Sequence, residues 1–184
     1  MSTPEKSKKT GLTRRALGGL GLAAALAGLS GCQSLPSEPQ PQERSALLQR
    51  MDAVIQGAHS PAGLRLQSQP DPVATGQTIG VEVSSAQAGY LYLYQIATDG
   101  KTLSMVFPNA VDGANYIQPG ITQLPRASWQ LRARGPEGVG YLVAVLTQQP
   151  LNLLTTQGQA NQGQFSMQAP YAAASSTLRE VAPR

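Results

Sequence analysis

From Leu64 onward the chain alternates apolar and polar residues with a period of two, and this pattern constrains the fold more than any other feature. Ile79, Val81 and Val83 alternate with small or polar neighbours, as the residues of a half-buried strand do. Turn signals rich in glycine, proline, aspartate and asparagine separate these runs, and the Asp-Gly pair at 99–100 is typical of a β-hairpin. The pattern therefore predicts short antiparallel strands.

Two runs have the character of central strands. Tyr90–Ile96 carries three tyrosines on one face and leucines on the other, and Val139–Leu146 is apolar on both faces. Residues 129–134 alternate apolar and polar side chains and are predicted to form another half-exposed strand. Strands at such turn-marked intervals are typical of a single antiparallel β-sandwich, immunoglobulin-like, with about six to eight strands. We therefore expect a mainly β protein.

An amphipathic helix precedes the predicted strands. Leu47, Met51, Val54 and Ile55 fall on one stripe of a helix over residues 43–58, and charged residues lie on its other side. We expect this stripe to pack on the sandwich, and the alternative is that it docks on a partner protein.

These elements divide the chain. The sandwich is expected over residues 63–168, ending in a helical turn at 151–154 and a loop at 155–164. Residues 32–42 are rich in proline and glutamine, which favours an extended, solvated tether. Residues 169–184 are predicted to form a flexible tail.

The N-terminus indicates export. A basic lead is followed by an apolar segment that is shorter than the roughly 20 residues of a membrane-spanning helix, as in a secretory signal. Residues 29–32 read LSGC and resemble the bacterial lipobox, in which the cysteine is lipidated and becomes the first residue of the mature chain. Residues 1–31 are therefore interpreted as a lipoprotein signal peptide and Cys32, the only cysteine, as the lipidation site. An ordinary signal peptide with an incidental cysteine is the alternative.

Two further features of the signal bear on location. Residues 13–17 resemble the twin-arginine export motif in part, so the general secretory and twin-arginine routes both stay open. Gln33 follows the cysteine in place of aspartate, which by resemblance to bacterial lipoprotein sorting favours the outer membrane over the inner membrane. We expect a lipid anchor at the periplasmic face of the outer membrane.

Charge excludes nucleic acid as the expected partner. The net charge of +4 comes from the predicted signal, which holds five of the 14 basic residues and one of the 10 acidic ones. Residues 32–184 carry nine of each and are formally neutral. They lack the basic patch of a nucleic-acid-binding domain.

The residue types needed for catalysis or metal binding are sparse. His59 is the only histidine, and the carboxylates are scattered singly. A hydrolytic triad needs a base beside a nucleophile, and a metal site needs clustered ligands. Folding could still bring Asp99 and Asp112 together as a carboxylate pair. We expect a non-catalytic protein with no metal and no cofactor other than the lipid on Cys32.

Two residue sets are candidates for binding. Tyr90, Tyr92 and Tyr94 share one strand face and are predicted to form an aromatic patch for a glycan or protein, unless that face lies in the core. Arg132 and Arg134 project from one side of their predicted strand. They are suited to an acidic partner or to the carboxylates of peptidoglycan, and a solvated sheet face is the alternative.

Several short motifs follow one another between Gly89 and Leu151. A Gly-Tyr-Leu-Tyr strand leads to an Asp-Gly turn, then to Phe107-Pro108-Asn109, and a final apolar strand closes the block. In this order they resemble the bacterial domain-of-unknown-function family 4384. The resemblance implies an architecture and a context rather than a chemistry. Such domains occur on secreted or lipid-anchored envelope proteins, and some lie near type VI secretion components.

The residues of the Phe-Pro-Asn motif are interpreted as structural. Phe107 is predicted to fill the core at a strand end, Pro108 to stop strand pairing and Asn109 to cap the following turn with its side chain.

Together these features predict a lipid-anchored, periplasm-facing scaffold or partner-binding protein of the bacterial envelope, in the context of type VI secretion by resemblance. Its expected partners are the membrane, through the lipid, and envelope proteins. The alternative is a peptidoglycan- or glycan-binding wall module that uses Tyr90, Tyr92 and Tyr94 as its platform.

Overall fold

The computed structural model describes residues 45–59, 62–168 and 170–183. The predicted signal peptide, Cys32 and the tether at 32–42 lie outside the described residues. The elements in chain order are α1 (Ala46–Gln56), β1 (Arg65–Gln69), β2 (Val73–Ala74), β3 (Gly80–Ser85), β4 (Gly89–Ile96), β5 (Leu103–Phe107), β6 (Tyr116–Ile117), β7 (Gly120–Leu124), β8 (Gly138–Thr147), α2 (Leu153–Asn161) and β9 (Tyr171–Val181). None of the described helices is long and apolar enough to cross a membrane.

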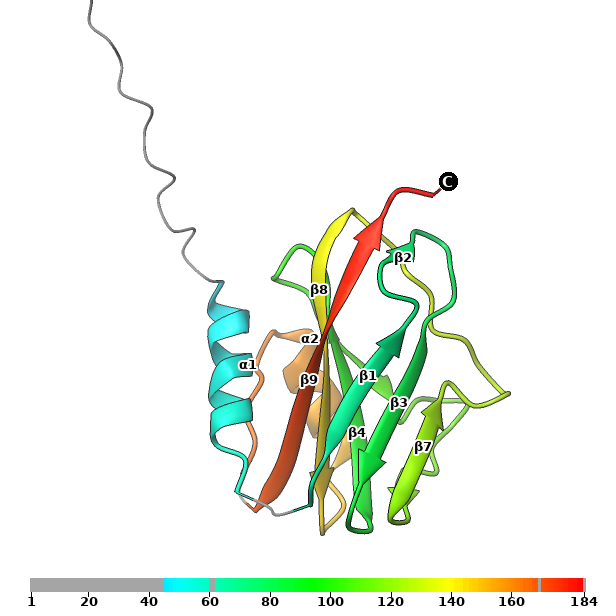
Figure 1. The fold of residues 1–184 in the computed structure, drawn as a ribbon. Coiled ribbons are helices and arrows are strands. Elements are labelled where there is room, and N and C mark those ends of the chain that lie inside the picture. The colour runs from blue at the N-terminus through cyan, green and yellow to red at the C-terminus, as the bar shows by residue number, and fades with distance from the viewer. Residues whose placement is uncertain (1–44, 60–61, 169, 184) are drawn as a thin grey trace, which may run out of the picture. The chain divides into compact units, whose positions relative to one another are not determined.

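The strands form two packed sheets, which confirms the predicted mainly β sandwich (Figure 1). The smaller sheet has the order β1-β3-β7, and the larger has the order β2-β9-β8-β4-β5 with β6 paired to β4. The strand pairings are antiparallel except that of β2 with β9, which is parallel. The described chain has nine strands where about six to eight were expected, and two of the nine, β2 and β6, consist of only two residues each.

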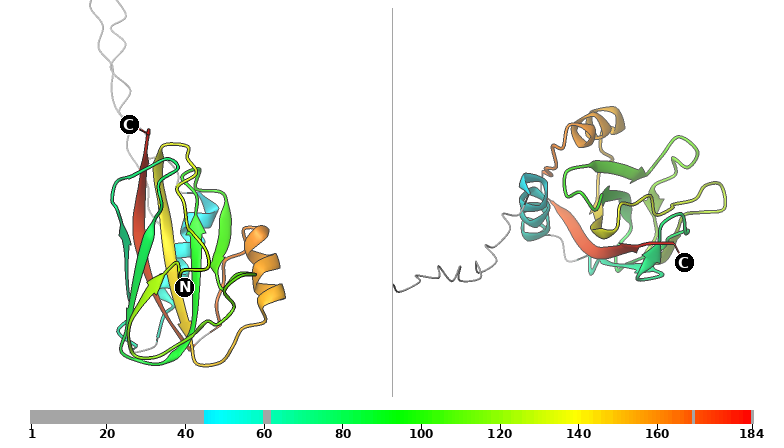
Figure 2. Two further views of the ribbon diagram at one scale, coloured as in Figure 1. Left: turned by 90° about the vertical axis from the view of Figure 1, so that its right-hand side faces the viewer. Right: turned by 90° about the horizontal axis from the view of Figure 1, so that it is seen from above.

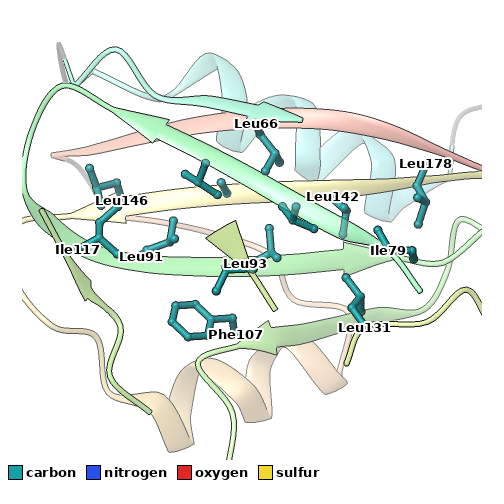
Figure 3. Packing of buried hydrophobic residues seen from close by; sticks show 14 of the residues in the cluster. Leu66, Ile79, Leu91, Leu93, Phe107, Ile117, Leu131, Leu142, Leu146 and Leu178 are labelled. Atoms are coloured by element: carbon teal, nitrogen blue, oxygen red, sulfur yellow. The ribbon is translucent and has the colours of Figure 1, made fainter. Parts of the chain in front are cut away.

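The main core lies between the two sheets. Strand β4 turns Leu91 and Leu93 into this space, where they meet Val81 and Val83 of β3. Burying a leucine or valine side chain contributes about 1.5–3 kcal/mol each, so these alternating positions hold the sheets together. Figure 3 shows this cluster, in which the labelled residues are Leu66, Ile79, Leu91, Leu93, Phe107, Ile117, Leu131, Leu142, Leu146 and Leu178.

A second core lies on the opposite face of the larger sheet, where both helices pack (Figure 2). Helix α1 buries Leu47, Met51 and Val54, so the predicted apolar stripe does face the sandwich. The helix begins after Ser45, whose hydroxyl accepts a hydrogen bond from the Leu48 amide at 3.3 Å and caps the first turn. Strand β4 is therefore buried on both faces.

The predicted flexible tail at 169–184 is wrong. Residues Tyr171–Val181 form β9, which pairs with β8 over ten residues and separates β8 from β2. The strand consists largely of alanine, serine and threonine, and only Tyr171 and Leu178 are large buried apolar residues. A strand that contributes mainly backbone hydrogen bonds and small side chains has little hydrophobic pattern to reveal it.

The prediction for residues 151–164 is also wrong. Helix α2 occupies Leu153–Asn161, whereas a helical turn followed by a loop was expected. The Asn152 side chain caps it by accepting a hydrogen bond from the Thr155 amide at 3.1 Å. Leu154 is 85% exposed and Ala160 is the helix's buried residue, so α2 packs through a small side chain and not through Leu154.

Residues 129–134 form an extended segment with one β-bridge, Thr78 to Arg132, instead of the predicted strand. The Ile79 amide donates to the Leu131 carbonyl at 2.8 Å, and the Ala133 amide donates to Gln77 at 3.0 Å. The alternation itself holds, because Leu131 and Ala133 are buried. This segment thus closes the sandwich beside the smaller sheet without joining it as a full strand.

Candidate binding cleft

A cleft of about 400 Å³ lies at the end of the sandwich that carries the β4–β5 hairpin. The ends of β4 and β5 form one wall, residues 130–136 form the other, and β9 contributes one residue. Its lining residues are Gln95, Ala97, Asp99, Thr102, Ser104, Val106, Gln130, Leu131, Arg132, Arg134, Gly135, Pro136 and Glu180. This cleft brings together both arginines that the sequence indicated.

The hairpin wall is fixed by Asp99. One carboxylate oxygen accepts hydrogen bonds from the Lys101 and Thr102 amides at 2.7 and 2.9 Å, and the other accepts from the Thr102 hydroxyl at 2.7 Å. Gly100 has φ +64°, which the tight turn requires and glycine adopts without strain. The two amide hydrogen bonds, with that of the Thr102 hydroxyl, hold the pKa of Asp99 below its usual value. The carboxylate is thus ionised and engaged in its own turn.

The opposite wall is fixed by Arg132. Its Nε and Nη2 donate to Gln130 Oε1 at 3.1 and 2.6 Å, and its Nη1 donates to the Gly76 carbonyl at 2.9 Å. These bonds tie the extended segment to the loop that precedes β3. Arg132 therefore has a largely structural part in the cleft.

Arg134 differs from Arg132 in this respect. It follows two residues later on the same side of the extended segment, is exposed and lines the cleft. Its side chain makes no hydrogen bond or ion pair with any residue in the described ranges. Arg134 is thus a guanidinium that remains available to a ligand.

Glu180 is the buried charge of the cleft. The residue is only 4% exposed, and its Oε2 accepts a hydrogen bond from the Gly135 amide at 2.7 Å. Sequence reasoning missed Glu180 because it lies on β9, in the region predicted to be a flexible tail. Neither its neighbours nor its spacing marked it as a site residue.

The predicted tyrosine platform is wrong. Tyr92 and Tyr94 are each 1% exposed in the second core, and the Tyr92 hydroxyl accepts a hydrogen bond from the Leu151 amide at 2.7 Å. Tyr90 is half-buried against Tyr116, with ring centroids 5.1 Å apart. The alternative, that this strand face lies in the core, is the correct one, because both helices cover it.

The Tyr94 hydroxyl is buried and has no hydrogen-bond partner in the described structure, and this burial raises the pKa of Tyr94. We expect Tyr94→Phe to raise the free energy of unfolding by about 1 kcal/mol, because it removes an unsatisfied polar group. The matched control Tyr92→Phe should lower it by about 1 kcal/mol, because the Leu151 amide loses its acceptor. Urea denaturation of both variants measures the two changes, and a loss of stability in Tyr94→Phe would contradict the prediction.

The Phe-Pro-Asn motif has the predicted structural roles. Phe107 is fully buried, and Asn109 Oδ1 accepts hydrogen bonds from the Val111 and Asp112 amides, each at 3.0 Å. Strand β5 ends at Phe107, so Pro108 lies where the pairing with β4 stops.

Sequence reasoning missed a polar network around this motif. Asp112 is 7% exposed and accepts hydrogen bonds from Arg126 Nη1 at 2.6 Å and from Trp129 Nε1 at 3.0 Å. The Trp129 ring stacks on Phe107 with centroids 6.4 Å apart, and the Arg126 guanidinium lies 5.2 Å from the Phe107 centroid. The network encloses the motif and fastens the loop after β5 to the segment that leads into the cleft wall.

The other residues that the sequence offered for catalysis or metal binding are not grouped into one site. His59 is exposed, and its ring contacts the Gly57 carbonyl. Asp99 and Asp112 belong to separate hydrogen-bond networks. In the part of the chain that the structure describes, no three histidine, cysteine, aspartate or glutamate side chains are grouped as metal ligands.

Comparison with known proteins supports the domain assignment. Residues 73–150 match the family described as Domain of unknown function (DUF4384), which confirms the resemblance and extends it toward the N-terminus. The matched segment runs from β2 to just beyond β8 and includes both walls of the cleft. No curated protein and no solved structure matches the chain.

Proposed function

We propose, on the premise that residues 73–150 carry a domain of this family, that the protein is a non-catalytic partner-binding lipoprotein of the bacterial envelope. A lipid on Cys32 would hold it at the periplasmic face of the outer membrane. The observation that carries the binding role is the cleft in which Arg134 has no intramolecular partner among the described residues. An accessory role in type VI secretion rests on the family resemblance.

The chemistry of the cleft favours a ligand with a carboxylate. A guanidinium presents a planar fork of N–H donors that matches a carboxylate in two parallel hydrogen bonds. Arg132 is already engaged, so Arg134 is the group that would contact the partner. Concave sites that combine apolar surface with polar groups are where proteins usually bind ligands, and this cleft is lined by residues of both kinds.

A non-catalytic role agrees with the way the cleft uses its polar groups. The Asp99 carboxylate is engaged by its own turn, and one oxygen of Glu180 accepts from the Gly135 amide. A general base also needs a nucleophile within hydrogen-bond reach, and among the described residues no serine, cysteine or histidine side chain donates to Glu180. His59, which could serve as one, does not line the cleft.

The anchor would keep the cleft near the membrane. The Ser45 hydroxyl donates to the Gly100 carbonyl, so α1 begins beside the hairpin that forms the cleft wall. Ser45 lies 13 positions after Cys32 in the sequence. At about 3.5 Å per extended residue this stretch spans at most about 45 Å. The expected partners are therefore envelope proteins within that distance of the membrane.

A peptidoglycan-binding role is the second candidate. Its tyrosine platform is buried, but the free guanidinium of Arg134 also fits the carboxylates of peptidoglycan stem peptides. The two candidates differ in what the cleft would contact in the cell.

Site-specific photocrosslinking in living cells tests the proposal. A photoreactive residue at Ser104, inside the cleft, is expected to crosslink an envelope protein, whereas one at Gln123, on the outer face of the smaller sheet, is not. Arg134→Gln should reduce the Ser104 crosslink about tenfold, as loss of a charged hydrogen bond predicts. Cys32→Ala should abolish it by releasing the protein from the membrane.

The other outcomes of this experiment are equally informative. A Ser104 crosslink that is unchanged in Arg134→Gln would contradict the proposed function. Recovery of crosslinked product with purified sacculi would favour the peptidoglycan candidate.

A further inference from the structure

The cleft is lined by charges of both signs that do not form an ion pair with each other. Arg134 and Glu180 both line it, yet no ion pair within 4.0 Å joins them. The Gly135 amide donates to Glu180, so the chain beside Arg134 is held next to this carboxylate. The Arg134 guanidinium and the Glu180 carboxylate are thus opposite charges of one cleft that do not pair with each other.

Glu180 has spare hydrogen-bonding capacity in a buried place. Its Oε2 accepts from Gly135, and its other oxygen has no hydrogen-bond partner among the described residues. This second oxygen is not fully enclosed, because in the described structure the Tyr94 hydroxyl is the buried side-chain polar atom that lacks a partner. The oxygen is therefore open to water or to a positively charged donor from a ligand, such as an ammonium group.

The other two charges of the cleft are already engaged. Asp99 accepts three hydrogen bonds from its own turn, and Arg132 donates three to Gln130 and Gly76. The lining contains two arginines and two acids, so it is formally neutral. This balance does not favour a ligand of net negative charge, and it matches one that carries a charge of each sign.

Neutral groups complete the site. Gln95 and Ser104 project into the cleft from β4 and β5, and no hydrogen bond of their side chains occurs among the described residues. An amide and a hydroxyl are suited to the N–H and C=O groups of a peptide bond. A volume of about 400 Å³ is near the lower end of the range for small-molecule sites, about 300–1,000 Å³.

We infer that the cleft binds a zwitterion, namely a short peptide with free ends, whose carboxylate contacts Arg134 and whose ammonium contacts Glu180. The inference rests on the proposed function in that it takes the same cleft as the binding site. It goes further because the proposed function needs only a carboxylate on the ligand, whereas the inference also needs an ammonium group that contacts Glu180.

Calorimetric titration of the detergent-purified full chain tests the inference. The probes are trialanine with free ends, N-acetyl-trialanine and trialanine amide. Free trialanine is expected to bind, and each blocked peptide should bind at least about tenfold more weakly, because one charge-assisted interaction is lost. Equal affinity for the free and the N-acetylated peptide would overturn the inference.

Two variants assign the contacts. Glu180→Gln keeps an oxygen for the Gly135 amide and removes the charge, so it should weaken free trialanine about tenfold and leave the N-acetylated peptide unchanged. Arg134→Gln should weaken both of these peptides, and Arg65→Gln, on the smaller sheet outside the cleft, should weaken neither. If Glu180→Gln does not fold, the comparison of free and blocked peptides on the natural chain still decides.

The failure of this inference is distinguishable from that of the proposed function. Persistence of the Arg134-dependent crosslink in cells without binding of any trialanine probe would overturn the zwitterion inference and leave partner binding in place.

Discussion

A chain that ends at Pro170 is expected not to fold. It lacks β9, which lies inside the larger sheet between β8 and β2 and pairs with β8 over ten residues. Each lost backbone hydrogen bond costs about 0.5–1.5 kcal/mol, and the buried Leu178 and Tyr171 side chains add about 1.5–3 kcal/mol each. With about ten such bonds, the sum is comparable to or larger than the roughly 5–15 kcal/mol by which domains are usually stable.

The loss of β9 also affects the helix layer. The Tyr171 hydroxyl donates to the Val54 carbonyl of α1 at 2.9 Å, so the truncated chain loses a contact that holds this helix. Circular dichroism and amide hydrogen exchange of the purified chains measure the outcome. A control chain that ends at Val181 keeps the whole strand and should retain the unfolding midpoint of the full chain. A cooperative unfolding transition in the chain ending at Pro170 would show that β9 is dispensable.

Asp112→Ala is expected to lower the free energy of unfolding by about 2–4 kcal/mol. The substitution removes a buried carboxylate that accepts from both Arg126 and Trp129. The indole N–H loses its acceptor and the guanidinium loses its counterion, while the 36% exposure of the Arg126 side chain lets water compensate in part. The Phe107–Trp129 stack should loosen as a result, because the indole loses the bond that orients it.

Two matched substitutions separate charge from position. Asp112→Asn retains an oxygen for the Trp129 indole and should lose about half as much stability. Asp71→Ala removes an exposed carboxylate paired with Arg179 and should change stability far less than Asp112→Ala. Urea denaturation measures these differences. The slope of the free energy of unfolding against urea concentration should stay the same, so that a shift in midpoint reports a change in stability alone. Equal losses in Asp71→Ala and Asp112→Ala would refute the structural role of the buried network.

The sequence by itself determined the strands that bury large residues on alternate positions. The sequence predicted strands β3, β4 and β8 and the apolar stripe of α1. In each of these segments the spacing of the apolar residues along the chain follows the faces that the element buries. The β4–β5 turn was predicted for the same reason, since Asp99 and Gly100 form it with their immediate neighbours. The two-sheet sandwich followed from these elements.

Only the tertiary structure decided which faces and charges meet. The alternation around Tyr92 and Tyr94 predicts two faces but cannot tell whether a helix layer covers one of them. Strand β9 depends on pairing with β8 rather than on a hydrophobic pattern of its own. Gly135 and Glu180 are 45 positions apart, so no local signal could place the carboxylate of Glu180 in the same cleft as Arg134. Local patterns determine elements, whereas a site assembled from distant residues exists only after the sheets have packed.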